Sequence, residues 1–291
     1  MKEKLKKRIR NFTERYPYIA YPLYVVFFGL IAFIIIYLLF YRLFLIEVIG
    51  VRFDYKFDFS VYLDERTPGV TYLELVLIGL ATTIEISLIS IILAMGLGVA
   101  LAVMRLSRVK ILDVVSKVYI EFFRNTPLLL QIFFWYYASH SVMPRFFTEW
   151  FYAQKNTELA YGVIALAAYT GAFIAEEIRA GIQSIPKEQM EASRSQGLTF
   201  LQAMFLVILP QAFRIVIPPL INQSLNLMKN SSLVMAIGVL EVMASSRFLF
   251  DETFRVFEAL SVATLIYLTL SLAISFGINQ YNKRFLRYIR Y

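Results

Sequence analysis

The sequence contains no cysteine and only one histidine among its 291 residues. The absence of cysteine excludes disulfides, thiol nucleophiles and cysteine-based metal sites, and one histidine excludes a multi-histidine metal centre within one chain. His140 stands where an apolar segment ends, which favours an interfacial side chain over a metal ligand. The sequence also lacks a Walker A glycine loop and a nucleophile elbow. We therefore expect no catalytic residues and no cofactor in this chain.

Apolar residues, by contrast, are abundant. Hydrophobic residues make up 59% of the chain and aromatic residues 16%, with a mean hydropathy of +0.63. A soluble domain is only about half apolar, so this composition predicts an integral membrane protein. The net charge of +8 could suggest nucleic acid as a partner. Membrane proteins carry their basic residues in cytoplasmic loops, however, so we expect no nucleic acid partner.

Six apolar segments are long enough to cross a bilayer, for which about 18 to 20 residues suffice. They are predicted at 23–40, 71–103, 112–138, 159–178, 205–228 and 257–281. The third span contains Pro127, which is expected to kink it, and the fifth contains Pro210, Pro218 and Pro219, which are expected to bend or break it. The fold class is therefore all-α, a polytopic membrane protein with six transmembrane helices.

The basic residues orient these spans. They concentrate in 1–15, around Arg105 and beyond Lys283, so both termini are predicted in the cytoplasm. The acid-leaning stretch 47–68 is predicted outside, either as a short strand or hairpin or as an ordered loop with aromatic side chains in the interface.

Two further segments are also predicted outside. The stretch 142–156 is a short outer loop in which Trp150 lies in the interface. The stretch 231–254 is a short or re-entrant helix, because a full span there would place the basic C-terminus outside.

The longest polar stretch with recognisable structural signals is Glu177–Pro210. Ser184 and Pro186 predict a helix start, and Gly197 followed by Leu198 predicts a helix stop. Thr199 and Gln202 have the spacing of a capping box that opens a second helix. The local prediction is therefore helix, glycine turn, helix. The alternative is an ordinary structured loop between two membrane helices.

Three ordered matches favour the first alternative. Glu191-Ala192-Ser193, Gly197 and Val207-x-Leu209-Pro210 resemble the EAA loop of the integral membrane subunits of bacterial ABC importers. Glu121–Gln131, EFFRNTPLLLQ, resembles the EFFRGTPLL segment of the polar amino acid branch, and Lys229–Val234, KNSSLV, resembles a run of that branch. The resemblance covers roughly Thr71 to the C-terminus. Ser193, Val207 and Asn125 depart conservatively from the usual Ala, Ile and Gly.

The resemblance implies a permease of the bacterial cytoplasmic membrane with a five-helix core. Residues 1–70 would then add a basic N-terminus, an extra helix and an outer loop to a transmembrane domain at 71–291. The implied partners are ATPase subunits that bind ATP and Mg²⁺, a second permease, identical or homologous, and an extracytoplasmic substrate-binding protein. The loop at about 179–205 would couple the permease to the ATPase through Glu191, Ala192, Ser193, Gly197 and Leu198.

Polar residues at membrane depth are the candidates for a translocation pathway. Glu85, Asn222 and Asn226 lie within predicted spans, where polar groups normally face protein or water instead of lipid. They could line a path for a polar amino acid or another small polar solute, or form structural hydrogen bonds between helices. Two other functions remain open: an autonomous carrier or channel that needs no ATPase, and a membrane scaffold, which would give these residues no role.

Overall fold

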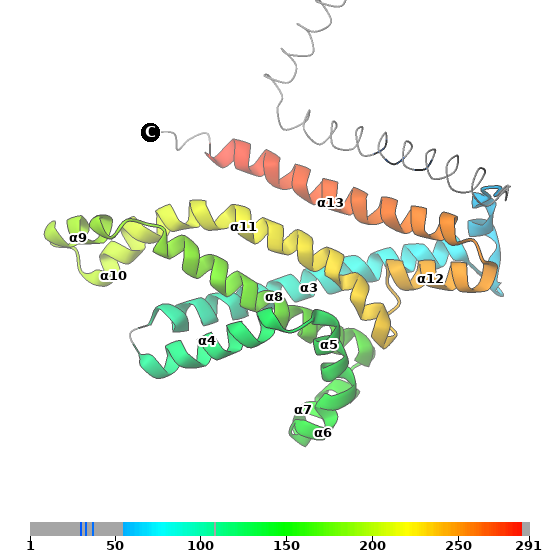
Figure 1. Cartoon of the computed structure of the whole chain (residues 1–291), viewed down its shortest axis with the longest axis horizontal. Coiled ribbons are helices and arrows are strands. Elements are labelled where there is room, and N and C mark those ends of the chain that lie inside the picture. The colour runs from blue at the N-terminus through cyan, green and yellow to red at the C-terminus, as the bar shows by residue number, and fades with distance from the viewer. Residues whose placement is uncertain (1–29, 31–32, 34–36, 38–54, 108, 287–291) are drawn as a thin grey trace, which may run out of the picture. The chain divides into compact units, whose positions relative to one another are not determined.

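The computed structural model describes residues 30, 33, 37, 55–107 and 109–286. The expected N-terminal span 23–40 and the basic stretch 1–15 lie outside the described residues, apart from Leu30, Phe33 and Tyr37. The chain divides into two units, one of residues 58–278 and the other of residues 1–57 with 279–291. The larger unit is almost entirely helical (Figure 1), which confirms the all-α class.

Long helices dominate this unit, and shorter helices connect them. The long helices are α3 (Tyr72–Leu106), α8 (Thr157–Gln183), α11 (Leu209–Asn230) and α13 (Val256–Leu286). The shorter ones are α4 (Lys110–Asn125), α5 (Leu128–Phe133), α6 (Ser139–Val142), α7 (Arg145–Tyr152), α9 (Lys187–Ser195), α10 (Phe200–Ala203) and α12 (Val242–Thr253). Four stretches of the described chain are long and apolar enough to cross a membrane: Tyr72–Leu106, Thr157–Gln183, Phe200–Ile237 and Val256–Gly277. They correspond to the predicted second, fourth, fifth and sixth spans.

The predicted third span is two helices and not one kinked helix. α4 ends at Asn125 and α5 begins at Leu128, with Pro127 between them. The break frees carbonyl groups at the end of α4, which have no water to bond at membrane depth. Gln131 supplies the missing donor, since its Nε2 lies 2.9 Å from the carbonyl oxygen of Phe123 and 3.1 Å from that of Thr126. A π-helical turn, Phe134–Ala138, follows α5.

The prolines of the fifth span do not break it. Pro210 is the second residue of α11. Pro218 and Pro219 lie inside α11, which nevertheless continues to Asn230. A π-helical turn, Met204–Ile208, comes just before α11. Neighbouring helices and such local adjustments let a membrane helix keep interior prolines.

Small residues allow the long helices to cross closely. α3 and α8 meet at Gly98, where an added Cβ would lie 2.4 Å from Cγ2 of Ile174. α8 and α11 meet at Gly181, where an added Cβ would lie 2.1 Å from Cγ2 of Val216. The buried core between these three helices includes Ala94, Ala167, Ile174 and Leu227.

The segment 231–254 forms a 3-10 helix, Ser231–Ile237, a left-handed turn at Gly238 and the 12-residue helix α12. Twelve residues rise only about 18 Å, less than the thickness of the hydrocarbon core. The prediction of a short helix in place of a full span is therefore confirmed.

Residues 55–71, the described stretch directly before α3, contain one 3-10 helix and one small hairpin. The 3-10 helix is Phe59–Leu63, and the hairpin pairs β1 (Glu65–Thr67) with β2 (Val70–Thr71) antiparallel. Residues 55–68, the described part of the stretch predicted outside, thus contain one strand, β1. This strand comes after the alternating sequence that suggested a strand, and its partner β2 lies at residues 70–71, beyond the predicted stretch. The 3-10 helix packs against α12 and α13 through Val61 and Tyr62, so this stretch and the turn between α12 and α13 lie at the same end of the unit, as predicted.

An ion pair joins the hairpin to α12. Arg66 Nη2 lies 2.9 Å from Glu252 Oε1, and the guanidinium carbon of Arg66 lies 4.1 Å from the centre of the Phe248 ring. The hydrogen bond from Arg66 holds the pKa of the Glu252 carboxyl below its usual value. The pair therefore contributes to stability above the ordinary glutamate pKa, and that contribution is lost as the pH falls through the lowered pKa.

Gly79 provides a test of the α3–α12 packing. An added Cβ at Gly79 would lie 2.8 Å from the backbone oxygen of Glu241, whereas at Gly96 in the same helix it would meet nothing within 4 Å. We expect Gly79→Ala to destabilise the protein by about 1–3 kcal/mol, because backbone cannot move aside as a side chain can. Gly96→Ala should be neutral or slightly stabilising. Thermal unfolding in detergent measures both, and equal melting temperatures would contradict the close crossing.

Candidate functional site

The connection between α8 and α11, which contains α9 and α10, lies beyond the ends of these two long helices (Figure 1). α8 ends at Gln183, and α9 begins at Lys187 after Pro186. The prediction that Ser184 starts α9 is wrong, because Ser184 Oγ donates to the carbonyl of Gly181, 2.7 Å away, at the end of α8. No side chain caps the start of α9.

The end of α9 follows the prediction. Gly197 has a φ of +92°, in the left-handed region. The amide of Gly197 donates to the carbonyl of Arg194 over 3.0 Å, and the amide of Leu198 donates to the carbonyl of Ser193 over 3.3 Å. This pair of bonds defines a Schellman motif, in which the left-handed residue is usually glycine. Gly197 therefore stops α9 and reverses the chain.

The next helix begins with the predicted capping box. The amide of Thr199 donates to Gln202 Oε1 over 2.9 Å, and the amide of Gln202 donates to Thr199 Oγ1 over 3.3 Å. The helix, glycine turn, helix arrangement is thus present from Lys187 to the start of α11.

A small apolar cluster holds this segment to the membrane helices. Ile185, Ile208 and Ala212 are buried together, and Met190 packs against them. Ser193 is also buried, and its hydroxyl donates to the carbonyl of Gln189. Met190 and Ser193 are three residues apart, so one narrow face of α9 is turned inward.

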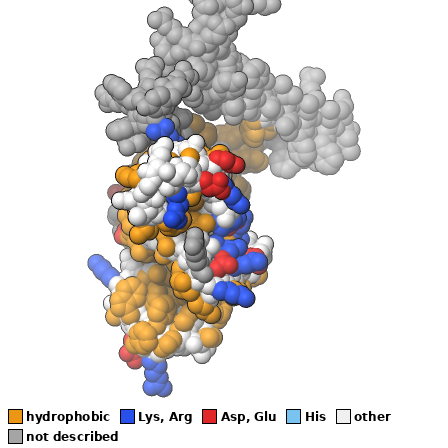
Figure 2. Space-filling view, turned by 90° about the vertical axis from the view of Figure 1, so that its left-hand side faces the viewer, with side chains coloured by type: hydrophobic (Ala, Val, Ile, Leu, Met, Phe, Trp, Pro, Cys, Tyr) orange, Lys and Arg blue, Asp and Glu red, His pale blue; other side chains and the backbone are white. Residues whose placement is uncertain are grey.

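The rest of α9 is open to contact. Glu191 and Ala192 are exposed, Gly197 is exposed, and Leu198 is half-buried. An added Cβ at Gly197 would meet nothing within 4 Å. Figure 2 looks onto this end of the molecule and shows charged side chains of both signs beside hydrophobic ones. Among the five predicted coupling residues, Ser193 is thus the one turned inward.

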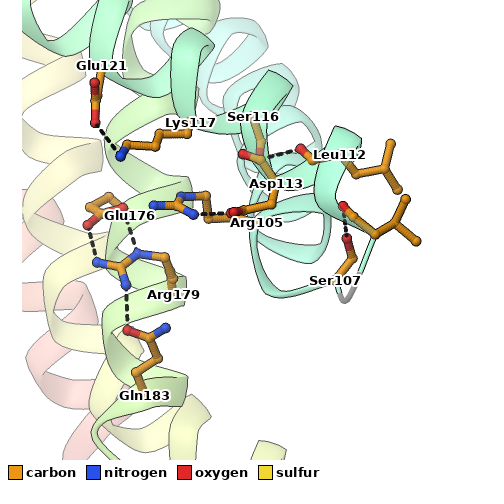
Figure 3. Close-up of polar contacts among 11 residues, drawn as sticks. Arg105, Ser107, Leu112, Asp113, Ser116, Lys117, Glu121, Glu176, Arg179 and Gln183 are labelled. Carbon is orange, nitrogen blue, oxygen red and sulfur yellow. Dashed lines mark hydrogen bonds and ion pairs between the residues drawn. The ribbon is translucent and has the colours of Figure 1, made fainter.

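Two groups of polar contacts lie near the ends of α3, α4 and α8, one within α8 and the other between α3 and α4 (Figure 3). Arg179 Nε lies 2.9 Å from Glu176 Oε2, and Arg179 also bonds Gln183 at the last residue of α8. Arg105 at the end of α3 pairs with Asp113 at the start of α4. These contacts were not predicted from the sequence. The signal was available, because Glu176 and Arg179 have the i, i+3 spacing of a helical ion pair.

The three predicted pathway residues are exposed in the single chain. Asn222 and Asn226 lie four residues apart on one face of α11. Glu85 lies on the face of α3 opposite the buried residues Thr83, Ile86 and Ser90. Within the described residues, no hydrogen bond or ion pair joins Glu85 to either asparagine. The structure therefore brings the two asparagines together but shows no contact between them and Glu85.

A second carboxylate in an apolar run has a different environment. Glu241 is fully buried and caps α12, since its Oε1 accepts from the amide of Ala244 over 2.7 Å. Tyr267 of α13 donates to its other oxygen, and the adjacent amide of Val242 donates to Thr83 of α3. The sequence analysis missed Glu241. An acidic residue within an apolar stretch is the same signal that identified Glu85.

Comparison with known proteins agrees with this arrangement. The family described as "Binding-protein-dependent transport system inner membrane component" matches residues 73–288. The chain is 41% identical over 236 residues to the Probable glutamine ABC transporter permease protein GlnM of Bacillus subtilis, covering 81% of this chain and 97% of that protein. It is 31% identical over 218 residues to the Glutamate/aspartate import permease protein GltJ of Escherichia coli, covering 74% and 89%.

Solved structures show the same fold. An amino acid ABC transporter determined with histidines matches with a TM-score of 0.68 at 30% identity, covering 79% of this chain and 100% of that one. The MetNI methionine ABC transporter in an inward-facing conformation matches with a TM-score of 0.54 at 18% identity, covering 76% and 96%. The second likeness concerns the fold alone.

Proposed function

The chain belongs to the binding-protein-dependent transport inner membrane component family as a membrane-spanning permease subunit of an amino acid ABC importer, and we propose that α9 couples it to an ATPase. In this proposal two cytoplasmic ATPase subunits bind ATP and Mg²⁺ and contact α9. A second permease, identical or homologous, completes the pathway, and an extracytoplasmic binding protein delivers a polar amino acid. This chain itself performs no covalent chemistry.

One observation carries the proposal: α9 is exposed on nearly all sides and yet firmly attached at its base. Only Met190 and Ser193 face inward, so the remaining side chains are free to meet a partner. The base contacts both Ile182 of α8 and Ala212 of α11. A push on α9 would therefore reach two membrane helices at once, as mechanical coupling requires.

The alternative of an autonomous carrier explains this segment poorly. A carrier that needs no ATPase has no use for an exposed helix, a Schellman stop and a capping box outside the membrane helices. A scaffold gives no reason for exposed Glu85, Asn222 and Asn226 within spans. We therefore favour the importer, with the identity of its small polar substrate set largely by the binding protein.

We assign Glu85, Asn222 and Asn226 to the pathway. Glu85 lies eleven residues beyond Glu74 in α3, about 16 Å along the helix and thus near the middle of the membrane. A carboxylate facing lipid at that depth is costly, so we place it against the pathway or the second permease. There it can attract the ammonium group of an amino acid, while the asparagine amides offer hydrogen bonds.

Gly197 tests the coupling. A β-branched residue in the left-handed region costs of order 1–2 kcal/mol, so Gly197→Val should misorient α9. We expect membrane insertion to persist while ATP-dependent uptake, measured in proteoliposomes with the ATPase and the binding protein, falls at least tenfold. Gly197→Asn is the matched control, because asparagine tolerates this conformation and should retain uptake. Wild-type uptake by the valine variant would reduce α9 to a connector, and uptake without ATPase would support the carrier.

Membrane orientation can be tested with single cysteines, because the native chain has none. We propose that α9 and both termini are cytoplasmic and that the α12–α13 turn is outside. In intact cells, an impermeant thiol reagent should label Asp251→Cys and leave Lys187→Cys unlabelled until the cells are opened. The reverse pattern would overturn the orientation.

Glu85→Gln tests the pathway assignment. The substitution removes the charge and keeps the shape, so folding and ATPase binding should persist. We expect uptake of an amino acid to weaken by about tenfold, because a single lost charge contact is worth roughly 1.4 kcal/mol or more. Glu149→Gln, an exposed carboxyl on α7, is the matched control and should leave uptake unchanged. Unchanged kinetics in Glu85→Gln would indicate a packing role.

A further inference from the structure

The helix α7 has two different apolar faces, and only one is used within the protein. It lies at the end of α8 opposite α9 (Figure 1). On the inward face Phe151 is fully buried and stacks on Tyr161 of α8, with ring centres 4.2 Å apart and 9° between the planes. Phe147, also on this face, packs against Trp135 of the preceding π-helical turn. These contacts fix which side of α7 points away from the protein.

The outward side is strongly apolar. Phe146 and Trp150, four residues apart on α7, are 74% and 55% exposed, and Val142 just before α7 is 69% exposed. Large apolar side chains grouped in this way on a protein surface normally mark a contact. The surface also continues onto a membrane helix, since Leu130 of α5 and Phe134 and Tyr137 of the π-helical turn are exposed as well.

Charge identifies the partner. Arg145 opens α7 and Lys155 follows it, and both are exposed without an ion pair or hydrogen bond among the described residues. Tryptophan flanked by exposed cations, next to a helix of a membrane span, is the pattern of an interfacial segment: the ring lies at headgroup level and the cations reach lipid phosphates. An eight-residue helix is too short to span the bilayer itself.

We propose that α7 lies in the lipid interface, with Phe146 and Trp150 at the boundary between headgroups and acyl chains and with Arg145 and Lys155 bound to headgroup phosphates. Through Phe151 and Phe147, α7 then anchors the end of α8 and the π-helical turn after α5 at this side of the membrane. α8 leads at its other end into α9. α7 therefore holds one end of α8, and the other end of α8 carries α9, the proposed coupling helix. The proposed lipid contact of α7 does not depend on that coupling and requires only that the chain spans a membrane.

Tryptophan fluorescence tests the depth of α7, because the chain has two tryptophans, Trp135 and Trp150. Trp135→Phe leaves Trp150 as the only tryptophan of this subunit, studied in the full chain reconstituted in vesicles without tryptophan-containing partners. We expect strong quenching by lipids brominated near the headgroup end of the acyl chain, weaker quenching by lipids brominated near the chain end, and little quenching by aqueous iodide. Trp150→Phe, which leaves half-buried Trp135, is the matched control and should respond less to every brominated lipid.

The opposite results would overturn the proposal. Strong iodide quenching without lipid quenching would place α7 in water, free for the binding protein. Protection from both quenchers would place Trp150 against a second copy of this chain.

The cations need a separate test. In Trp135→Phe, vesicles that contain phosphatidylglycerol should increase lipid quenching of Trp150 relative to vesicles of phosphatidylcholine alone. Adding Arg145→Gln and Lys155→Gln should abolish that difference while the quenching in phosphatidylcholine remains, because the apolar contact is intact. A double variant that still responds to phosphatidylglycerol would show that these two side chains do not bind the headgroups.

Discussion

The satisfaction of backbone hydrogen bonds without water is the constraint on which the rest of this structure depends. Inside a bilayer an unpaired carbonyl or amide costs several kcal/mol, so the backbone groups freed where a helix is interrupted need other partners, such as polar side chains. Gln131 does this at the break between α4 and α5, and Thr83 and Glu241 do it at the start of α12. Some polar residues within the apolar sequence therefore allow a helix to end or begin within the membrane, because they bond the backbone groups that are freed there.

Predictions from the sequence were most accurate where the interacting residues lie close together in the chain. Gly197, Thr199 and Gln202 were predicted correctly because a Schellman stop and a capping box are built from residues a few positions apart. Ser184 was assigned to the wrong helix because its hydroxyl can either donate to a preceding carbonyl, as it does to Gly181, or accept from the amides that follow. Sequence alone does not decide between these two local bonds.

Interactions between distant segments were largely beyond prediction. The helix α11 continues through Pro218 and Pro219, although these prolines were expected to bend or break it. Glu85 and Glu241 give the same signal in sequence, an acid in an apolar run. One is exposed and the other is enclosed by Tyr267 and the start of α12, because only the packing of α3, α12 and α13 determines which face each helix buries.

The stiffness of α8 connects the two ends of the proposed mechanism. A helix transmits a displacement only if it moves as a rigid body, and close packing provides that rigidity. α8 is fixed against α3 where Gly98 meets Ile174, and against α11 where Gly181 meets Val216. Arg179 further ties Glu176 to Gln183 across its last turns. A force applied to α9 would therefore be carried along α8 and shared with α3 and α11 before it could be absorbed by local bending. Since Glu85 lies on α3 and the two asparagines on α11, such a movement would displace the residues assigned to the pathway together, relative to the proposed second permease.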